Sequence, residues 1–248
     1  MNRLLVLAAA LLATAGAAPH SGYQDASPPV RAMQDDDAAN PGFLWVQQGE
    51  ALWSQPAGTS GKSCASCHGA VATMRGVATR YPAYDAKLGH VLTLDQRIAQ
   101  CRTERQGAPA LATDSNDLLG LTALVGLQSR GLPMAVDTTG AARPFYEAGR
   151  ALFETPMGQL NLSCADCHDG LAGHHLAGAT IPQGQPNGYP LYRLEWQAMG
   201  SLYRRLRNCT TGVRAEPFAP NSPDFNAIAF YLGARATGLP VETPAVRP

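Results

Sequence analysis

The sequence predicts an all-α protein built from two tandem domains, because helix-forming segments recur along the chain at a nearly constant distance. Residues 49–53 are repeated at 149–153, an offset of 100, and residues 117–133 align without gaps on 224–240, an offset of 107. Few runs show the alternation of β-branched residues that is typical of strands. Each domain is therefore expected to begin and to end with a helix.

Each repeat also contains one pentapeptide of the pattern Cys-x-x-Cys-His. The two copies, Cys64-Ala-Ser-Cys67-His68 and Cys164-Ala-Asp-Cys167-His168, lie 100 residues apart. Two thiols at this spacing add to the vinyl groups of haem, and the adjoining histidine becomes the proximal iron ligand. A zinc ribbon would place its cysteine pairs roughly 15 to 20 residues apart, and a thioredoxin-like site has a single pair near a βαβ pattern. The sequence thus predicts two covalently bound haem c groups in two class I cytochrome c-like domains.

The N-terminal residues predict export. A basic residue at position 3, an apolar run from Leu4 to Ala13 and small residues ending at Ala17 are typical of a secretory signal peptide, residues 1–17, which indicates a periplasmic protein. No stretch approaches the roughly 20 apolar residues of a membrane span. Removal of the signal leaves 18 basic and 19 acidic residues, and nothing in this balance suggests nucleic-acid binding.

The remaining organisation follows from composition and helix caps. Residues 18–42 have little periodic apolar content, so we expect an N-terminal arm that is either mobile or laid along the surface. The first domain should span 43–133, with a linker at 134–144, and the second 145–240, with a short tail at 241–248. Ser222-Pro223-Asp224 predicts a helix start, and Thr93-Leu94-Asp95-Gln96 is a capping box.

Two cysteines remain outside the haem motifs, Cys101 and Cys209, and each repeat holds one of them. In an oxidising compartment two spare cysteines commonly form a disulfide. Here a disulfide would require equivalent points of two domains to meet, whereas ligation requires only that each helix face its own haem. We therefore favour Cys101 and Cys209 as the distal iron ligands. Thiolate is a soft anionic donor that suits ferric haem and lowers its reduction potential.

Methionine and histidine are the competing distal donors. None of the six methionines recurs at an equivalent position in the two repeats. His90, His174 and His175 remain possible donors, but the last two follow His168 so closely that surface positions are the expected outcome for them.

Arginine lies four residues before each of these cysteines, so Arg97 should share a helix face with Cys101, and Arg205 with Cys209. A cation at that position lowers a thiol pKa. Alternatively, both arginines pair with haem propionates. Basic residues are dense around Cys209, and such a cluster could bind an oxyanion; its members are Arg204, Arg205, Arg207 and Arg214.

With these features the chain resembles the dihaem A subunit of the SoxAX cytochromes of bacterial thiosulfate oxidation. The resemblance rests on the two Cys-x-x-Cys-His motifs, the single cysteine after each, and the run 209–218, in which Cys209 is followed by Arg214-Ala215-Glu216. It covers both predicted domains, and the run 209–218 is its most specific part.

The resemblance implies an L-cysteine S-thiosulfotransferase, in which Cys209 is both the distal ligand of the second haem and the catalytic cysteine, carried as a persulfide. Arg205 matches the substrate-binding arginine of the family. The first haem, with His68 and Cys101, resembles one that lies remote from the chemistry. The implied reaction joins thiosulfate to a cysteine of the SoxYZ carrier protein and releases two electrons through haem to a small cytochrome c. The implied partner is the monohaem subunit SoxX, in a heterodimer.

Three other functions remain open from the sequence. A thiosulfate dehydrogenase that forms tetrathionate also uses a cysteine-ligated haem. A dihaem electron-transfer protein would leave Cys101 and Cys209 idle or joined in a disulfide. A dihaem peroxidase is disfavoured, since nothing indicates an open iron position.

Overall fold

The computed structural model describes residues 18–248, and the predicted signal peptide, residues 1–17, lies outside them. Helices dominate the fold, and the strands are short. The first repeat comprises α2 (Phe43–Ser54), α3 (Cys64–His68), η1 (Val71–Met74), η2 (Ala78–Arg80), β1 (Ala83–Asp85), β2 (His90–Leu92), α4 (Leu94–Cys101), the π-helical turn η3 (Arg102–Gln106) and α5 (Asn116–Leu127). The second repeat comprises α6 (Arg143–Glu154), α7 (Cys164–His168), β3 (His175–Leu176), β4 (Ala179–Thr180), β5 (Leu191–Arg193), β6 (Ala198–Gly200), α8 (Leu202–Gly212) and α9 (Pro223–Arg235). Outside the repeats lie α1 (Pro28–Asp35), η4 (Gly140–Ala142) and β7 (Ala245–Arg247).

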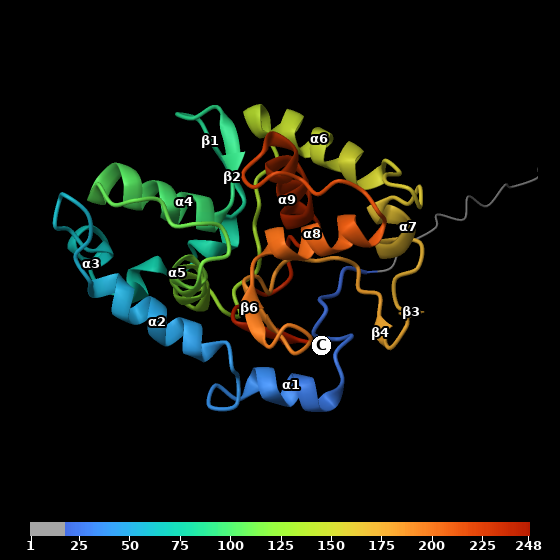
Figure 1. Cartoon of the computed structure of the whole chain (residues 1–248), viewed down its shortest axis with the longest axis horizontal. Coiled ribbons are helices and arrows are strands. Elements are labelled where there is room, and N and C mark those ends of the chain that lie inside the picture. Colours follow the sequence, from blue (N-terminus) through green and yellow to red (C-terminus); the bar gives the residue numbers. More distant parts are fainter. Residues whose placement is uncertain (1–17) are drawn as a thin grey trace, which may run out of the picture.

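The two repeats share one order of helices, as the sequence predicts. An opening helix, a five-residue helix with the haem motif, a cysteine-bearing helix and a closing helix follow one another as α2–α3–α4–α5 and α6–α7–α8–α9. Figure 1 shows the first set on one side of the molecule and the second on the other. The predicted caps form: the Ser222 hydroxyl accepts from the amide of Phe225, and the Gln96 side chain accepts from the amide of Thr93.

Opening and closing helices cross at close range in both repeats. A Cβ on Gly49 of α2 would lie 2.3 Å from the carbonyl oxygen of Gly120 in α5, and one on Gly149 of α6 would lie 2.1 Å from that of Ala227 in α9. Only glycine lets the backbones approach so closely. Buried Val46, Trp53 and Leu124 fill the first interface. The corresponding core of the second is built on Phe153, Ile228 and Tyr231.

The fold is mostly helical, as predicted, and it also contains a few short strands that the sequence did not predict. Each repeat contains a hairpin between its haem motif and its cysteine-bearing helix, β1–β2 in the first and β5–β6 in the second, both antiparallel. These strands have only three residues each, too few for alternation to stand out in the sequence.

The predicted tail is also not peripheral. Residues 245–247 form β7, which pairs in parallel with β5, so β5 is the central strand of the sheet β6–β5–β7. Of the two expected forms of the arm, the structure shows one that lies against the protein. Its helix α1 packs on β7 through Val30 and Val246, and the amide of Val246 donates to Gln34 Oε1 at 3.0 Å. Figure 1 shows α1 beside the C-terminus.

The close helix crossing predicts a large effect of one methyl group. Gly149→Ala should lower the free energy of unfolding by about 1–3 kcal/mol, because α6 and α9 must move apart. Urea unfolding of the haem-loaded protein measures the change. Gly212→Ala is the matched control, since nothing lies within 4 Å of its added Cβ. Equal stabilities of the two variants would contradict the crossing.

Candidate functional site

The two haem motifs form helices of five residues that are fixed at their first turn by capping boxes. The Ser63 hydroxyl accepts from the amide of Ser66 at 3.1 Å, and the Ser66 hydroxyl accepts from the amide of Ser63 at 3.0 Å. In the second motif Ser163 and Asp166 make the same exchange, at 3.1 and 2.8 Å. Helical spacing then places both cysteines and the histidine of each motif on one face.

The surroundings of the first motif fit a haem. Cys67 and His68 are exposed, while Cys64 packs against apolar side chains. They belong to the buried cluster of Val46, Trp53 and Leu124, against which Val71, Met74, Val77, Leu94, Ile98 and Leu127 also pack. The buried Gln106 amide lies beside Cys64, with its nitrogen 3.9 Å from the sulfur and its oxygen without a hydrogen-bond partner. Exposed donors beside an apolar lining and an unsatisfied polar atom are what a covalently attached porphyrin would cover and complete.

His168 of the second motif is positioned as a metal ligand. Its Nδ1 is 2.6 Å from the carbonyl oxygen of Pro182, so Nδ1 carries the proton and Nε2 is left free. Gly184 leaves room for the ring, since a Cβ there would lie 3.2 Å from it. Burial lowers the pKa of His168, which keeps the imidazole neutral, and the nearby Arg205 charge acts in the same direction. In the first motif, His68 lies 5.9 Å from the ring of Trp53.

Cys101 and Cys209 each lie beside the motif of their own repeat. Each is the eighth residue after its helix cap, Thr93 or Ser201. The pKa of Cys164 is raised to about 11, by burial first and then by the neighbouring Cys209 sulfur. Cys101 is close enough to influence the pKa of Cys64 in the same way. All six cysteines are unpaired, so the structure contains no disulfide between Cys101 and Cys209.

Backbone hydrogen bonds fix the end of each cysteine-bearing helix. In the first repeat the amides of Thr59 and Ser60 donate to the carbonyls of Gly107 and Gln106, at 3.3 and 3.1 Å. In the second repeat the loop before the motif makes the same contacts, Gln159 to Arg214 and Leu160 to Val213, both at 3.3 Å. We call these two sets of bonds the loop clamps. Each clamp joins the loop that precedes a haem motif to the residues that follow Cys101 in the first repeat or Cys209 in the second.

Arginine acts on the Cys101 thiol in the expected direction, but it is not the largest influence. The Arg97 charge does lower the pKa of Cys101, but burial acts more strongly and raises it. The alternative is that Arg97 pairs with a haem propionate. Other partners compete for its guanidinium, which forms an ion pair with Asp85 and donates a hydrogen bond to Gln100 at 2.7 Å. Tyr81 receives a third bond at 3.3 Å.

The four arginines predicted around Cys209 separate into different environments. Arg207 and Arg214 are exposed, and the Arg204 guanidinium stacks on the ring of Trp196 at 4.3 Å. Arg205 is half-buried, and within residues 18–248 it has no ion pair. Its charge influences the pKa of His168 and of Tyr189, which places it at the centre of this site.

Sequence reasoning missed two residues of this site, Tyr189 and Arg193. Both precede Cys209 by 16 residues or more, and the hairpin β5–β6 brings them back to α8. Arg205 and Cys209 lie close enough to both side chains to influence their pKa values electrostatically, after the larger effect of burial. Their positions could have been found by extending the repeat alignment, since Tyr81-Pro82 and Tyr189-Pro190 are 108 residues apart.

The competing histidines are all exposed, as expected for His174 and His175, and His90 is exposed as well. They lie on the short strand pair β3–β4, immediately before it, or at the start of β2.

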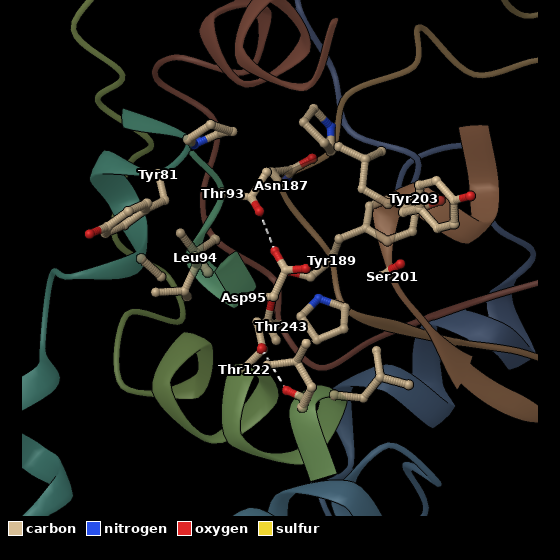
Figure 2. Close-up of a pocket in the computed structure, with 18 of the residues that line it drawn as sticks. Tyr81, Thr93, Leu94, Asp95, Thr122, Asn187, Tyr189, Ser201, Tyr203 and Thr243 are labelled. Carbon is tan, nitrogen blue, oxygen red and sulfur yellow. Dashed lines mark hydrogen bonds between the residues drawn. The ribbon is translucent and has the colours of Figure 1, made fainter. Parts of the chain in front are cut away.

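A cavity of about 90 Å³ lies where the two repeats meet, and Tyr189 borders both this cavity and the site around Cys209. Figure 2 shows it lined by Tyr81 and Thr93 from the first repeat and by Tyr189 and Tyr203 from the second, with Asp95 among them. The Asp95 carboxylate accepts from the Thr93 hydroxyl, and burial raises its pKa. None of the predicted site residues lines this cavity.

Comparison with known proteins agrees with this geometry. The model of the SoxA/TsdA cytochrome c domain family matches residues 48–134 and again residues 148–241. The chain is 40% identical to the L-cysteine S-thiosulfotransferase subunit SoxA of Rhodovulum sulfidophilum over 92% of this chain and 79% of that protein. It is 35% identical to SoxA of Paracoccus pantotrophus over the same shares. The chain belongs to the SoxA family of L-cysteine S-thiosulfotransferase subunits.

The resemblance drawn from the motifs is thereby confirmed. The crystal structure of SoxXA from P. pantotrophus matches with a TM-score of 0.89 at 35% identity, covering 92% of this chain and 87% of that chain. SoxA membership brings with it a cytochrome c fold with covalent haem c, an L-cysteine S-thiosulfotransferase activity and a role in thiosulfate oxidation. Between residues 18 and 248, no helix is both long and apolar enough to cross a membrane.

The loop clamp of the second repeat gives a testable prediction. Gly158→Ala should destabilise the haem-loaded protein by about 2 kcal/mol and alter its ferric absorption spectrum, because the new Cβ would lie 2.2 Å from the carbonyl oxygen of Val213. Gly173→Ala is the control: this glycine also has a positive φ, but nothing lies within 4 Å of its Cβ. Indistinguishable spectra and stabilities would show that the clamp does not hold α8.

Proposed function

We propose that this SoxA chain carries two haem c groups, one in each of two class I cytochrome c-like domains. Cys64 and Cys67 would attach the first haem, with His68 and Cys101 as its axial ligands. Cys164, Cys167, His168 and Cys209 would hold the second. The support is the equivalence of the two repeats, in which the same helices, capping boxes and loop clamps present the same donors.

The reaction proposed for the second site is the oxidative joining of thiosulfate to a carrier cysteine. One carrier thiol and one thiosulfate dianion give an S-thiosulfonate, one proton and two electrons, and the new bond is between two sulfur atoms. The haem, when bound, supplies a one-electron acceptor. The observation that carries the assignment is the position of Cys209, a half-buried cysteine next to Arg205, whose guanidinium has no carboxylate partner within residues 18–248.

The residues of the chain have separate roles in this proposal. Cys209 is the catalytic cysteine, carried as a persulfide. Arg205 binds the substrate through charge-assisted hydrogen bonds to its sulfonate oxygens, for which the guanidinium fork is well suited. Cys101 lies next to an arginine that Asp85 already neutralises, so the first haem serves electron transfer at most.

The partners follow from the family and from the sequence. The matched crystal structure is titled SoxXA, which supports a heterodimer with the monohaem SoxX subunit. The SoxYZ carrier protein provides the acceptor cysteine, and a small cytochrome c receives the electrons. The signal sequence at residues 1–17 supports a periplasmic location. A thiosulfate dehydrogenase is not favoured, because the relatives described above are named thiosulfotransferase subunits.

The first test removes the catalytic sulfur. Cys209→Met should leave a folded protein with both haems but abolish the coupling of thiosulfate to the carrier, because a thioether can ligate iron but cannot carry a persulfide. Mass spectrometry of the carrier measures the product. Asn208→Ala, at the exposed neighbouring position of α8, is the control. Undiminished coupling in the Cys209 variant would refute the catalytic assignment.

The second test removes the anion ligand. Arg205→Ala should raise the KM for thiosulfate about tenfold or more, since a charged hydrogen bond of roughly 1.5–3 kcal/mol is lost. Arg207→Ala removes the same charge from an exposed position of the same helix, and its KM should match that of the unaltered protein. Unchanged saturation in the Arg205 variant would count against substrate binding by this residue.

A further inference from the structure

The hairpins of the two repeats have identical register, so their positions can be compared one by one. In β1–β2, Asp85 lies opposite His90, and in β5–β6, Arg193 lies opposite Ala198. Both pairs are separated by 108 residues, the offset that also relates Arg97 to Arg205 and Cys101 to Cys209. Arg193 therefore occupies in the second repeat the position that Asp85 occupies in the first, with the opposite charge.

In the first repeat this position neutralises the arginine beside the distal cysteine. Asp85 forms an ion pair with Arg97, and the amides of Lys87 and Leu88 also donate to the carboxylate, at 2.8 and 3.1 Å. The ion pair holds the pKa of Asp85 at about 2, so the carboxylate stays charged. Because its charge is matched and its donors are engaged, Arg97 is not available to an external anion.

In the second repeat the same position adds a second cation. The side chain of Arg193 is only 13% exposed, and its buried Nε has no hydrogen-bond partner among residues 18–248. Glu195 lies 3.3 Å away, but its side chain is 61% exposed, so this pair is a weak surface contact. Arg205 is close enough for its charge to lower the pKa of Arg193, after burial, and the Cys209 sulfur lies within the same range.

The hairpin also holds Arg193 in place. Its guanidinium lies 5.2 Å from the ring centre of Trp196, which Arg204 also contacts. On its other side β5 is paired with β7, with Arg193 opposite Arg247. Arg247 is itself paired with Glu242, so it is occupied elsewhere. A largely buried, positioned guanidinium with a free Nε donor, next to the Arg205 guanidinium that has no ion pair within residues 18–248, is a ready anion site.

We propose that Arg193 and Arg205 together bind thiosulfate beside Cys209, and that the Asp85–Arg97 ion pair removes the corresponding site beside Cys101. Arg193 is then a second substrate-binding residue, and the charge at this one hairpin position decides which cysteine receives the substrate. The inference rests on the proposed function, since it assigns the substrate of that site.

Two substitutions test this assignment in the haem-loaded protein with its partner subunit. Arg193→Gln should raise the KM for thiosulfate about tenfold while kcat changes less, and it should weaken thiosulfate binding, measured by calorimetry without the carrier protein, by a similar factor. Arg193→Asp should have the larger effect, because the introduced carboxylate would pair with Arg205 as Asp85 pairs with Arg97. Arg193→Lys should recover part of the binding.

The controls separate this inference from structural effects and from the proposed function. Arg207→Gln removes an exposed charge from α8 and should leave thiosulfate binding unchanged, and haem content and unfolding temperature report the integrity of each variant. Unaltered thiosulfate binding and KM in a folded Arg193→Gln variant would overturn the inference. A shifted haem potential with unchanged thiosulfate binding would also overturn it, because that result would indicate that Arg193 contacts a haem propionate. Either result leaves the proposed function standing if Cys209→Met still abolishes coupling.

Discussion

The site depends on the loop clamps. Each clamp is a pair of backbone hydrogen bonds between the loop before a haem motif and the turn after Cys101 or Cys209. A five-residue helix such as α3 or α7 cannot hold its position by itself, because helices this short are not stable in isolation. The clamp joins the helix with the motif histidine to the helix with Cys101 or Cys209. The two candidate ligands of one iron are thereby positioned by the backbone, independently of side-chain packing.

The same constraint explains the π-helical turn η3. Gly107, which bears the clamped carbonyl, lies six positions after Cys101, whereas Arg214 lies five positions after Cys209. Both clamps nevertheless form with the same pattern, so the first repeat must accommodate one additional residue in the same space. A π-helical turn widens the helix by one residue per turn, and η3 lies directly between Cys101 and the clamp. This additional residue explains why the sequence offset between equivalent positions of the two repeats changes from 108 at Cys101 and Cys209 to 107 after them.

The parts of this structure that could be predicted from the sequence are those with local chemical signatures. The haem motifs, the repeated helices, the caps and the position of Cys101 and Cys209 beside the motif of their own repeat all follow from spacing. The hairpins could not be predicted, because three-residue strands leave no periodic pattern, and neither could β7, whose partner strand lies more than 50 residues away. Arg193 was missed for the same reason: it approaches Cys209 only through the hairpin.

The difference between the two sites follows from a few positions on this shared backbone. Three hairpin and helix positions of the first repeat hold Asp85, Leu88 and Gln96, and their counterparts are Arg193, Trp196 and Arg204. The first set leaves Arg97 neutralised, while the second adds two cations around Arg205 and an aromatic ring that contacts both of them. Two half-buried guanidinium groups repel each other and lose hydration, so this arrangement opposes folding unless an anion compensates it. One substitution of Arg193 by aspartate would give the second repeat the neutral ion pair that Asp85 and Arg97 form in the first. An arrangement that opposes folding and is so easily replaced needs a reason to persist. The proposed binding of dianionic thiosulfate beside Cys209 would supply that anion.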